Sequence, residues 1–354
     1  MPQSKAKIAL DKIIRKSRVH LYKPIQVAEI LYHHRIEKKL VLNDLESYRN
    51  ISKHWRDEIS AHLVGRKSTS SQKFQDNLFE ANAIPPKILS ELGVINKKMG
   101  GIVEKYIYEA LEMRLTTVTE IEDYINDTTT ENFSLLDLVG KFEHTPGLKR
   151  SIDKMYEILV YALFSTIVRA LEATVSIEIK NKDRDIITDF ERFIKMVIGI
   201  DGEKTKIELP ASLYRVGVTN AADRGLDMWT NFGPIVQVKH LTLTPQVVED
   251  IALDMRADKI IIVCLKSEKK AIEGLLKQVG WSERIQGILT LDDLNHWYKI
   301  CLNPKYKNSL GKVLLKDISR EFKAEFPGST KIGPFLKERK YNTIKLPKDW
   351  IHIA

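Results

Sequence analysis

Residues 222–240, with the sequence ADRGLDMWTNFGPIVQVKH, decide the fold of this chain. They place a carboxylate, Asp227, ten positions before Gln237, which is followed by Val238 and Lys239 in an apolar run. Because successive side chains of a strand point to opposite faces, Gln237 and Lys239 point one way and Val238 is buried behind them. The intervening TNFG loop predicts a hairpin that returns this strand beside the one carrying Asp227.

The predicted hairpin brings together a carboxylate, an amide oxygen and an ammonium group. Such a group can hold a divalent cation and a phosphate, as metal-assisted cleavage of a phosphodiester requires. A Gln-Val-Lys step in a strand also fits an ordinary solvated face. The spacing alone therefore leaves a purely structural hairpin open.

The residues after the hairpin predict the rest of an α/β core. Thr244 and Pro245 suit the start of a helix that continues to about residue 255. Residues 259–265 form an almost unbroken apolar run, typical of a strand buried on both faces. A second amphipathic helix at 268–279 and a strand at 285–291 follow. This order predicts a mixed sheet flanked by helices.

Composition narrows the class of protein. The chain has 354 residues, of which 43% are hydrophobic and 29% charged, which is enough for an ordinary core. It contains no apolar run near the roughly 20 residues of a membrane span and no secretory signal, so we expect a cytoplasmic protein. The two cysteines, Cys264 and Cys301, suggest neither a disulfide framework nor a zinc site. No phosphate-binding loop of an ATPase occurs.

Positive charge is concentrated at the two ends. Residues 1–76 hold 16 Lys or Arg against 8 Asp or Glu, and residues 303–354 hold 12 against 5. The chain as a whole carries +9, so its middle is net acidic. This pattern fits a protein whose basic ends bind a polyanion while its acidic centre binds a cation. Basic termini that only keep the protein soluble fit it as well.

These observations predict three regions. Residues 1–147 would form a mainly helical DNA-recognition region, 148–302 the nuclease core, and 303–354 a small basic extension that contacts DNA. Residues 151–171 form the most apolar helix, suited to a core or a subunit interface. Residues 185–198 predict a helix with its apolar side chains turned inward. The tail has a helix, turn and basic helix, as a helix-turn-helix or a plain extension would.

Residues 47–79 interleave cations with aromatic side chains and contain a Ser/Thr tract at residues 68–72. Cations with neighbouring hydroxyls and amides suit phosphate positioning and base-edge reading, although a charged amphipathic helix followed by a polar loop fits equally. The expected DNA contacts here, with two from the tail, are Arg56, Arg66, Lys67, Ser70, Ser71, Gln72, Lys73, Lys337 and Lys340.

Four blocks of sequence carry a family resemblance: KSRVHLYKPIQVAEIL, SKHWRDEISAHLVGRKSTSSQKFQDNLF, VYALFSTIVRALEA and the segment from SLYRVGVTNAADRGLDMW to VQVKHLTL. The chain resembles HaeII-type restriction endonucleases, and its hairpin resembles the active-site hairpin of PD-(D/E)xK nucleases. The resemblance implies a Mg²⁺-dependent type II endonuclease that cuts duplex DNA at a short palindrome of purine-GCGC-pyrimidine type. It also implies a cognate methyltransferase in the same restriction-modification system. A palindromic site further predicts a homodimer.

The same resemblance implies roles for the hairpin residues. Asp227 would be the main Mg²⁺ ligand, with the Gln237 side-chain oxygen and the Val238 carbonyl, and Lys239 would orient or deprotonate the attacking water. Asp223 would be a supporting or second-metal residue, or an N-cap. Gln237 stands where these nucleases usually have an acid, so a further ligand such as Asp223 or Glu157 is expected.

Two other functions stay open on the sequence. A methyl-directed or junction-resolving nuclease of the same superfamily would also use Gln at this position. A DNA-binding regulator would keep the hairpin as structure and would bind without cleaving under any divalent ion.

Overall fold

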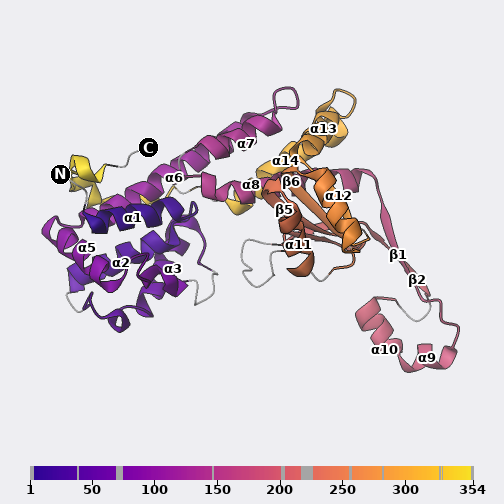
Figure 1. Ribbon diagram of the computed structural model, residues 1–354, viewed down its shortest axis with the longest axis horizontal. Helices are drawn as coiled ribbons and strands as arrows, with labels where there is room; N and C mark the ends of the chain where they lie inside the picture. Colours follow the sequence, from indigo (N-terminus) through magenta and orange to yellow (C-terminus); the bar gives the residue numbers. More distant parts are fainter. Residues whose placement is uncertain are drawn as a thin grey trace. The chain divides into compact units, whose positions relative to one another are not determined.

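The computed structural model describes residues 4–37, 40–68, 75–145, 147–200, 204–216, 226–254, 257–280, 283–326, 328 and 330–351 (Figure 1). These residues form two compact units. The helical unit contains the described residues of Met1–Ile158 and Ile318–Ala354, and the sheet unit those of Leu159–Val216 and Leu226–Asp317. The predicted boundaries at 147 and 302 therefore differ from the structural ones.

The helical unit is built from helices joined by short loops. The side chain of Ser4 caps the first helix by accepting a hydrogen bond from the Lys7 amide at 3.2 Å. Residues 86–127 form two helices, which are separated at Gly100 and Gly101, both with positive φ. None of the described helices is both long and apolar enough to cross a membrane. The helices are α1 (Lys5–Lys16), α2 (Tyr22–Glu37), α3 (Ile51–Val64), α5 (Pro86–Lys98), α6 (Ile102–Asp127), α7 (Leu135–His144), the start of α8 (Ile152–Ala170), most of α14 (Lys312–Glu325) and α15 (Ile332–Glu338).

The C-terminal segment packs inside the helical unit. Arg339, just after α15, forms an ion pair with the buried Glu29 of α2 at 3.2 Å. Tyr341 donates a hydrogen bond to Glu104 of α6 at 2.7 Å. Glu104 also accepts both branches of a bidentate contact from Arg35, at 2.9 and 2.7 Å. The tail therefore belongs to the helical unit, because Arg339 and Tyr341 bind the buried carboxylates of Glu29 and Glu104.

The sheet unit contains a five-stranded mixed sheet in the order β3-β4-β5-β6-β7. The first three strands pair antiparallel and the last three parallel. Thr290 and Asp293 form a capping box at the start of the helix that follows β7. The elements are β3 (Leu213–Arg215), β4 (Met228–Thr230), β5 (Ile235–Leu243), α11 (Pro245–Asp254), β6 (Ile260–Ser267), α12 (Lys269–Gln278), β7 (Ile285–Leu289) and α13 (Leu291–Leu302).

The sheet is covered on one face by α11 and α12, which share a hydrophobic cluster with β5, β6 and β7 (Figure 1). The cluster includes Val248 and Ile251 from α11, Ile272 from α12, and Ile260 and Ile262 from β6. The predicted hairpin and the predicted order of helix, strand, helix and strand after it are confirmed. This mixed sheet flanked by helices is compatible with a restriction-endonuclease-like fold.

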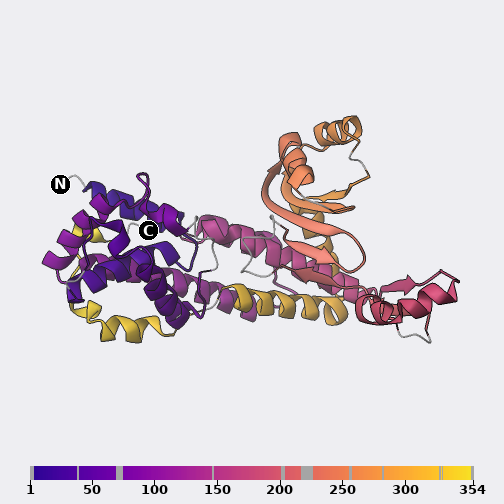
Figure 2. The same ribbon diagram turned by 90° about the horizontal axis from the view of Figure 1, so that it is seen from below.

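A narrow arm, residues 174–210, extends from the end of α8. Its base is an antiparallel ribbon of β1 (Thr174–Glu178) and β2 (Lys206–Pro210), and its tip carries α9 (Arg184–Asp189), α10 (Glu191–Phe193) and a π-helix (Ile194–Ile198) (Figures 1 and 2). The expectation that the apolar side chains of 185–198 point inward is wrong for three of the six side chains expected to do so, whereas Ile194 is buried. Phe190, Phe193 and Val197 are 58%, 54% and 66% exposed, because the ribbon carries these helices away from any core within their own unit.

Candidate active site at the β4–β5 hairpin

Asp227 immediately precedes β4 and is fixed by its backbone. Its carbonyl accepts a hydrogen bond from the Val216 amide, just after β3, at 2.9 Å. On the other side, β4 pairs with β5 at only two positions, Met228 with Val236 and Trp229 with Ile235. Asp227 therefore stands where the backbone ladder between β4 and β5 ends.

The carboxylate of Asp227 continues that ladder with its side chain. Its Oδ2 atom accepts a hydrogen bond from the Val238 amide at 2.8 Å and one from the Gln237 side-chain nitrogen at 2.6 Å. Donation to a charged acceptor makes these contacts stronger than neutral hydrogen bonds. The structure thus brings Asp227, Gln237 and Val238 together, three of the residues predicted for the site.

The other half of the Gln237 amide has no protein partner. Gln237 is only 1% exposed, and its Oε1 is a buried acceptor without a hydrogen bond from any described residue. Leaving such a group unsatisfied costs about 1–3 kcal/mol. An oxygen that is buried, unpaired and adjacent to a carboxylate matches the chemistry of a hard cation, so these residues fit Mg²⁺.

Lys239 lies two residues further along β5 and is half-buried. Within the described ranges it forms neither a hydrogen bond nor an ion pair. The pairing of β5 with β6 loses its regular register directly after Lys239, between Lys239 and Thr242. Such irregularities redirect side chains beside active sites. An uncompensated ammonium group is thus placed on the strand that carries Gln237.

Two further residues, Asp223 and Glu157, are expected as ligands from the sequence. Asp223 lies outside the described residues. Glu157 belongs to the helical unit, where its carboxylate is bound by Lys154 at 2.7 and 2.8 Å. Among the described residues, no group of three or more His, Cys, Asp and Glu side chains could hold a metal. The candidate ligand set is instead one carboxylate, one amide oxygen and one backbone carbonyl.

One pair of aromatic residues beside the site escaped the sequence analysis. Tyr214 of β3 and Trp229 of β4 face each other across the strands and stack with ring centroids 4.2 Å apart. Both are about two-fifths exposed, at 41% and 43%. The sequence contains both aromatic residues, in the segments LYR and MWT. That they lie opposite each other follows only from the register in which β3 and β4 pair.

The residues expected to contact DNA fall into different environments. Lys67, Lys337 and Lys340 are exposed and Arg66 is half-buried. Arg56 is only 2% exposed, and its guanidinium donates to Asp57, Gln26 and Gln75. A direct phosphate contact by Arg56 is at odds with this burial. The expected residues Ser70, Ser71, Gln72 and Lys73 lie outside the described residues.

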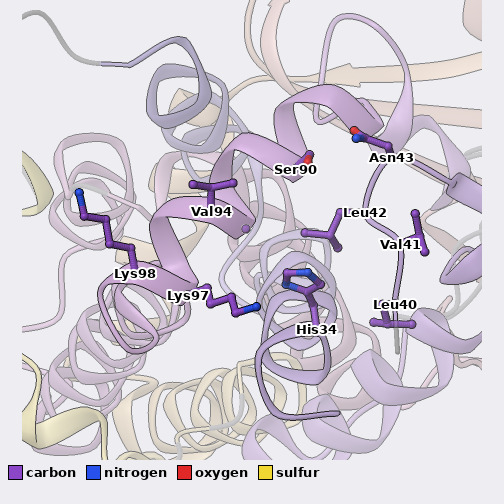
Figure 3. Close-up of a pocket in the computed structure, with 10 residues that line it drawn as sticks. His34, Leu40, Val41, Leu42, Asn43, Ser90, Val94, Lys97 and Lys98 are labelled. Carbon is purple, nitrogen blue, oxygen red and sulfur yellow. The ribbon is translucent and has the colours of Figure 1, made fainter. Parts of the chain in front are cut away.

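The helical unit also holds a pocket of about 600 Å³ lined by residues of α2, α5 and the segment 40–43 (Figure 3). Lys97 points toward His34 in this pocket, and Lys98 lies at its edge (Figure 3). Burial and the nearby Lys97 charge lower the pKa of His34, so the imidazole is neutral at pH 7. The two exposed lysines thus add positive charge to this surface.

The sequence of this chain is similar to known proteins over nearly its whole length. It matches the family described as HaeII restriction endonuclease over residues 6–341. It is 49% identical over 339 residues to Type II restriction enzyme HaeII of Haemophilus aegyptius, covering 95% of this chain and 96% of that protein. Type II restriction enzyme NgoBI of Neisseria gonorrhoeae is also 49% identical, with 95% of each chain covered. No solved structure matches. The chain belongs to the HaeII restriction endonuclease family, whose named relatives are type II restriction enzymes.

Proposed function

We propose that this enzyme hydrolyses phosphodiester bonds of duplex DNA at a short palindromic site with Mg²⁺, and that the β4–β5 hairpin is its active site. The observation that carries the assignment is the contact of Asp227 with Gln237, which leaves Gln237 Oε1 buried and unpaired. The names of the relatives support the reaction class, and the resemblance supports a site of purine-GCGC-pyrimidine type.

Three oxygen donors would hold the metal: the Asp227 carboxylate, Gln237 Oε1 and the Val238 carbonyl. The N–H and C=O of one residue in an extended strand point toward the same neighbour, so the Val238 carbonyl is directed to the side of Asp227. When bound, Mg²⁺ supplies positive charge to the scissile phosphate and lowers the pKa of a bound water. Asp223 would serve beside this set, as a further ligand or in support of it.

Lys239 would act on the attacking water and the phosphate. Its Nζ is free of partners among the described residues, so it can orient the water as an ammonium group, or accept a proton from the water as a neutral amine. As an ammonium group it offsets the charge that develops on the phosphate oxygens. Gln237 positions Asp227 through its Nε2, which holds Oδ2 at 2.6 Å.

The basic surface of the helical unit would position the duplex. Arg66 and Lys67, continuing into Ser70, Ser71, Gln72 and Lys73, would read base edges, and Lys337 and Lys340 would contact phosphates. The exposed Lys97 and Lys98 beside the pocket would add phosphate contacts. Arg56 would hold the segment that precedes these residues, through its internal hydrogen bonds.

A palindromic site also has consequences for assembly. Two identical half-sites related by a two-fold axis are matched most simply by a homodimer with one active site per strand. A cognate methyltransferase acting on the same sequence would protect host DNA, as a functional partner that need not bind this chain.

The test is cleavage of an unmodified plasmid with Mg²⁺ and with EDTA, followed by sequencing of fragment ends. The proposal expects discrete fragments whose ends share one short palindrome, and none with EDTA. Metal-independent binding without cleavage under any divalent ion would contradict it and indicate a DNA-binding regulator. Cleavage restricted to methylated DNA would indicate a methyl-directed nuclease.

A further inference from the structure

The arm exposes an unusual concentration of large apolar side chains. Among the described residues, 25 large hydrophobic side chains are exposed, and seven of them lie in the 37 residues of the arm. At its tip, Phe190, Phe193, Met196 and Val197 are 58%, 54%, 75% and 66% exposed. Contiguous exposed apolar groups of this kind mark surfaces that bind another molecule.

The charge of the arm argues against DNA as that molecule. Residues 174–210 contain 7 Lys or Arg and 8 Asp or Glu, although the whole chain carries +9. A segment that contacts phosphates has an excess of cations. The arm tip is therefore suited to an apolar protein surface.

The same unit offers such a surface beside the root of the arm. A groove of about 720 Å³ lies among α8, α13 and the sheet, and its lining includes Ile167, Leu171, Phe232, Trp297 and Ile300. Leu171 is 70% exposed, and Phe232 and Ile300 are each 41% exposed. None of the tip residues lines this groove. Leu171 is three residues before the arm begins, so groove and tip lie at opposite ends of one ribbon.

We propose that the arm tip of one chain packs into the groove of a second copy, and that the second arm does the same in return. A two-fold interface must be self-complementary: where residue i of one chain meets residue j of the other, j must also meet i. An apolar projection and an apolar groove on one unit, separated by a paired ribbon, meet this requirement. The inference rests on the proposed cleavage of a two-fold symmetric site and adds the surface that forms the dimer.

Cross-linking tests the contact directly. Met196→Cys and Leu171→Cys are made as two separate variants in a Cys301→Ser background, because both positions are exposed and the native Cys301, although buried, is a free thiol that lines the groove. Mixing the two variants and oxidising with glutathione disulfide should give a covalent dimer of twice 40.7 kDa. Each variant alone should give far less. Efficient cross-linking of Met196→Cys alone would mean that tips meet tips, and an absence of cross-links in the mixture would equally overturn the proposal.

Sedimentation of a charged variant provides the second readout. Phe193→Glu with Met196→Glu should convert the dimer to a 40.7 kDa monomer, whereas Leu136→Glu, at a 48% exposed position of α7, should leave it unchanged. Wild-type protein that cuts both strands but sediments as one chain per cognate duplex would remove this inference and the proposed homodimer, and would leave the proposed cleavage reaction standing. If the Cys variants cross-link as described but the wild-type dimer never cleaves DNA, this inference stands and the proposed function fails.

Discussion

The side-chain nitrogen of Gln237 donates a hydrogen bond to Oδ2 of Asp227 at 2.6 Å across the β4–β5 hairpin. An amide can make this contact at neutral pH, whereas two ionised carboxylates at that distance repel each other. The hairpin therefore holds the Asp227 carboxylate, the proposed metal ligand, in place without a cation. The single negative charge of this pair also distinguishes it from sites that use two acids.

Replacing Asp227 or Lys239 should remove the chemistry and spare DNA binding. Asp227→Asn keeps the size of the side chain but loses the charge, and Lys239→Ala loses the only ammonium group on β5. We expect a fall in cleavage rate of at least about 100-fold for each, the scale of losing one stabilising group from an active site. Gel shifts with cognate duplex would report binding separately from cleavage.

The matched controls are Asp292→Asn at the exposed start of α13 and Lys270→Ala on α12. Both should cleave at wild-type rate. Cleavage by Asp227→Asn or Lys239→Ala at the rate of these controls would show that the hairpin is structural.

Gln237→Glu should retain cleavage activity, but the pH at which cleavage is half-maximal should be higher than in the wild type. A second carboxylate beside Asp227 would share a proton with it, and this raises the pKa of the pair. Cleavage at saturating Mg²⁺ should therefore fall at acidic pH more steeply than in the wild type, while Gln237→Leu should be inactive throughout. A Gln237→Leu variant as active as the wild type would exclude Gln237 Oε1 as a ligand.

Lys337 and Lys340 should contribute to DNA affinity without regard to sequence. Each phosphate contact that is removed should make the dependence of the logarithm of the DNA-binding constant on the logarithm of the salt concentration less steep by about 1. Lys337→Ala with Lys340→Ala should therefore reduce the steepness by about 2. The arm variant Lys180→Ala with Lys182→Ala is the matched control and should leave the slope unchanged. Equal slopes in the wild type, the Lys337/Lys340 variant and the Lys180/Lys182 variant would show that the tail does not contact DNA.

Lys67 should affect the choice of sequence more than affinity in general. It continues into the Ser/Thr tract, whose hydroxyls and amides suit base edges. Lys67→Glu should narrow the difference in affinity between cognate and single-mismatch duplexes. If Lys67→Glu and the Lys337/Lys340 variant weaken all duplexes alike, the division between base reading and phosphate contact is wrong.

The stability of the helical unit should fall in mild acid through His20. Burial, with the charges of Arg66 and Arg18, lowers the pKa of His20 to about 4. As pH falls below about 6.5, His20 takes up a proton in the unfolded chain but stays neutral in the folded chain. The free energy of unfolding therefore has its full value above that pH and decreases toward pH 4. The loss at pH 5 is about 2 kcal/mol.

Urea unfolding at pH 7.5 and pH 5 measures this effect. His20→Phe can keep the stacking on Tyr22, whose ring centroid is 5.4 Å away, and has no titrating group. It should lose about 2 kcal/mol less than the wild type over this pH range. An equal loss in both proteins would show that other groups carry the acid sensitivity.

The sequence predicted the hairpin and the strands after it because their signals are local. The alternation of apolar and polar residues at 236–239 and the apolar run of β6 need no knowledge of distant residues. The burial of Arg56 depends on Gln26 and Gln75, and the docking of the tail depends on Glu29 meeting Arg339, pairings that no local pattern encodes. Periodicity also identifies the apolar side chains of residues 185–198, but it does not show whether they are buried, and several of them are exposed.

The most direct test of the account is a paired assay of wild type and Asp227→Asn on unmodified plasmid with Mg²⁺. The account predicts discrete fragments ending at one short palindrome for the wild type. It predicts intact plasmid for Asp227→Asn, with cognate DNA still bound. Fragments produced by Asp227→Asn at the wild-type rate would contradict the central claim that the Asp227–Gln237 hairpin is the active site.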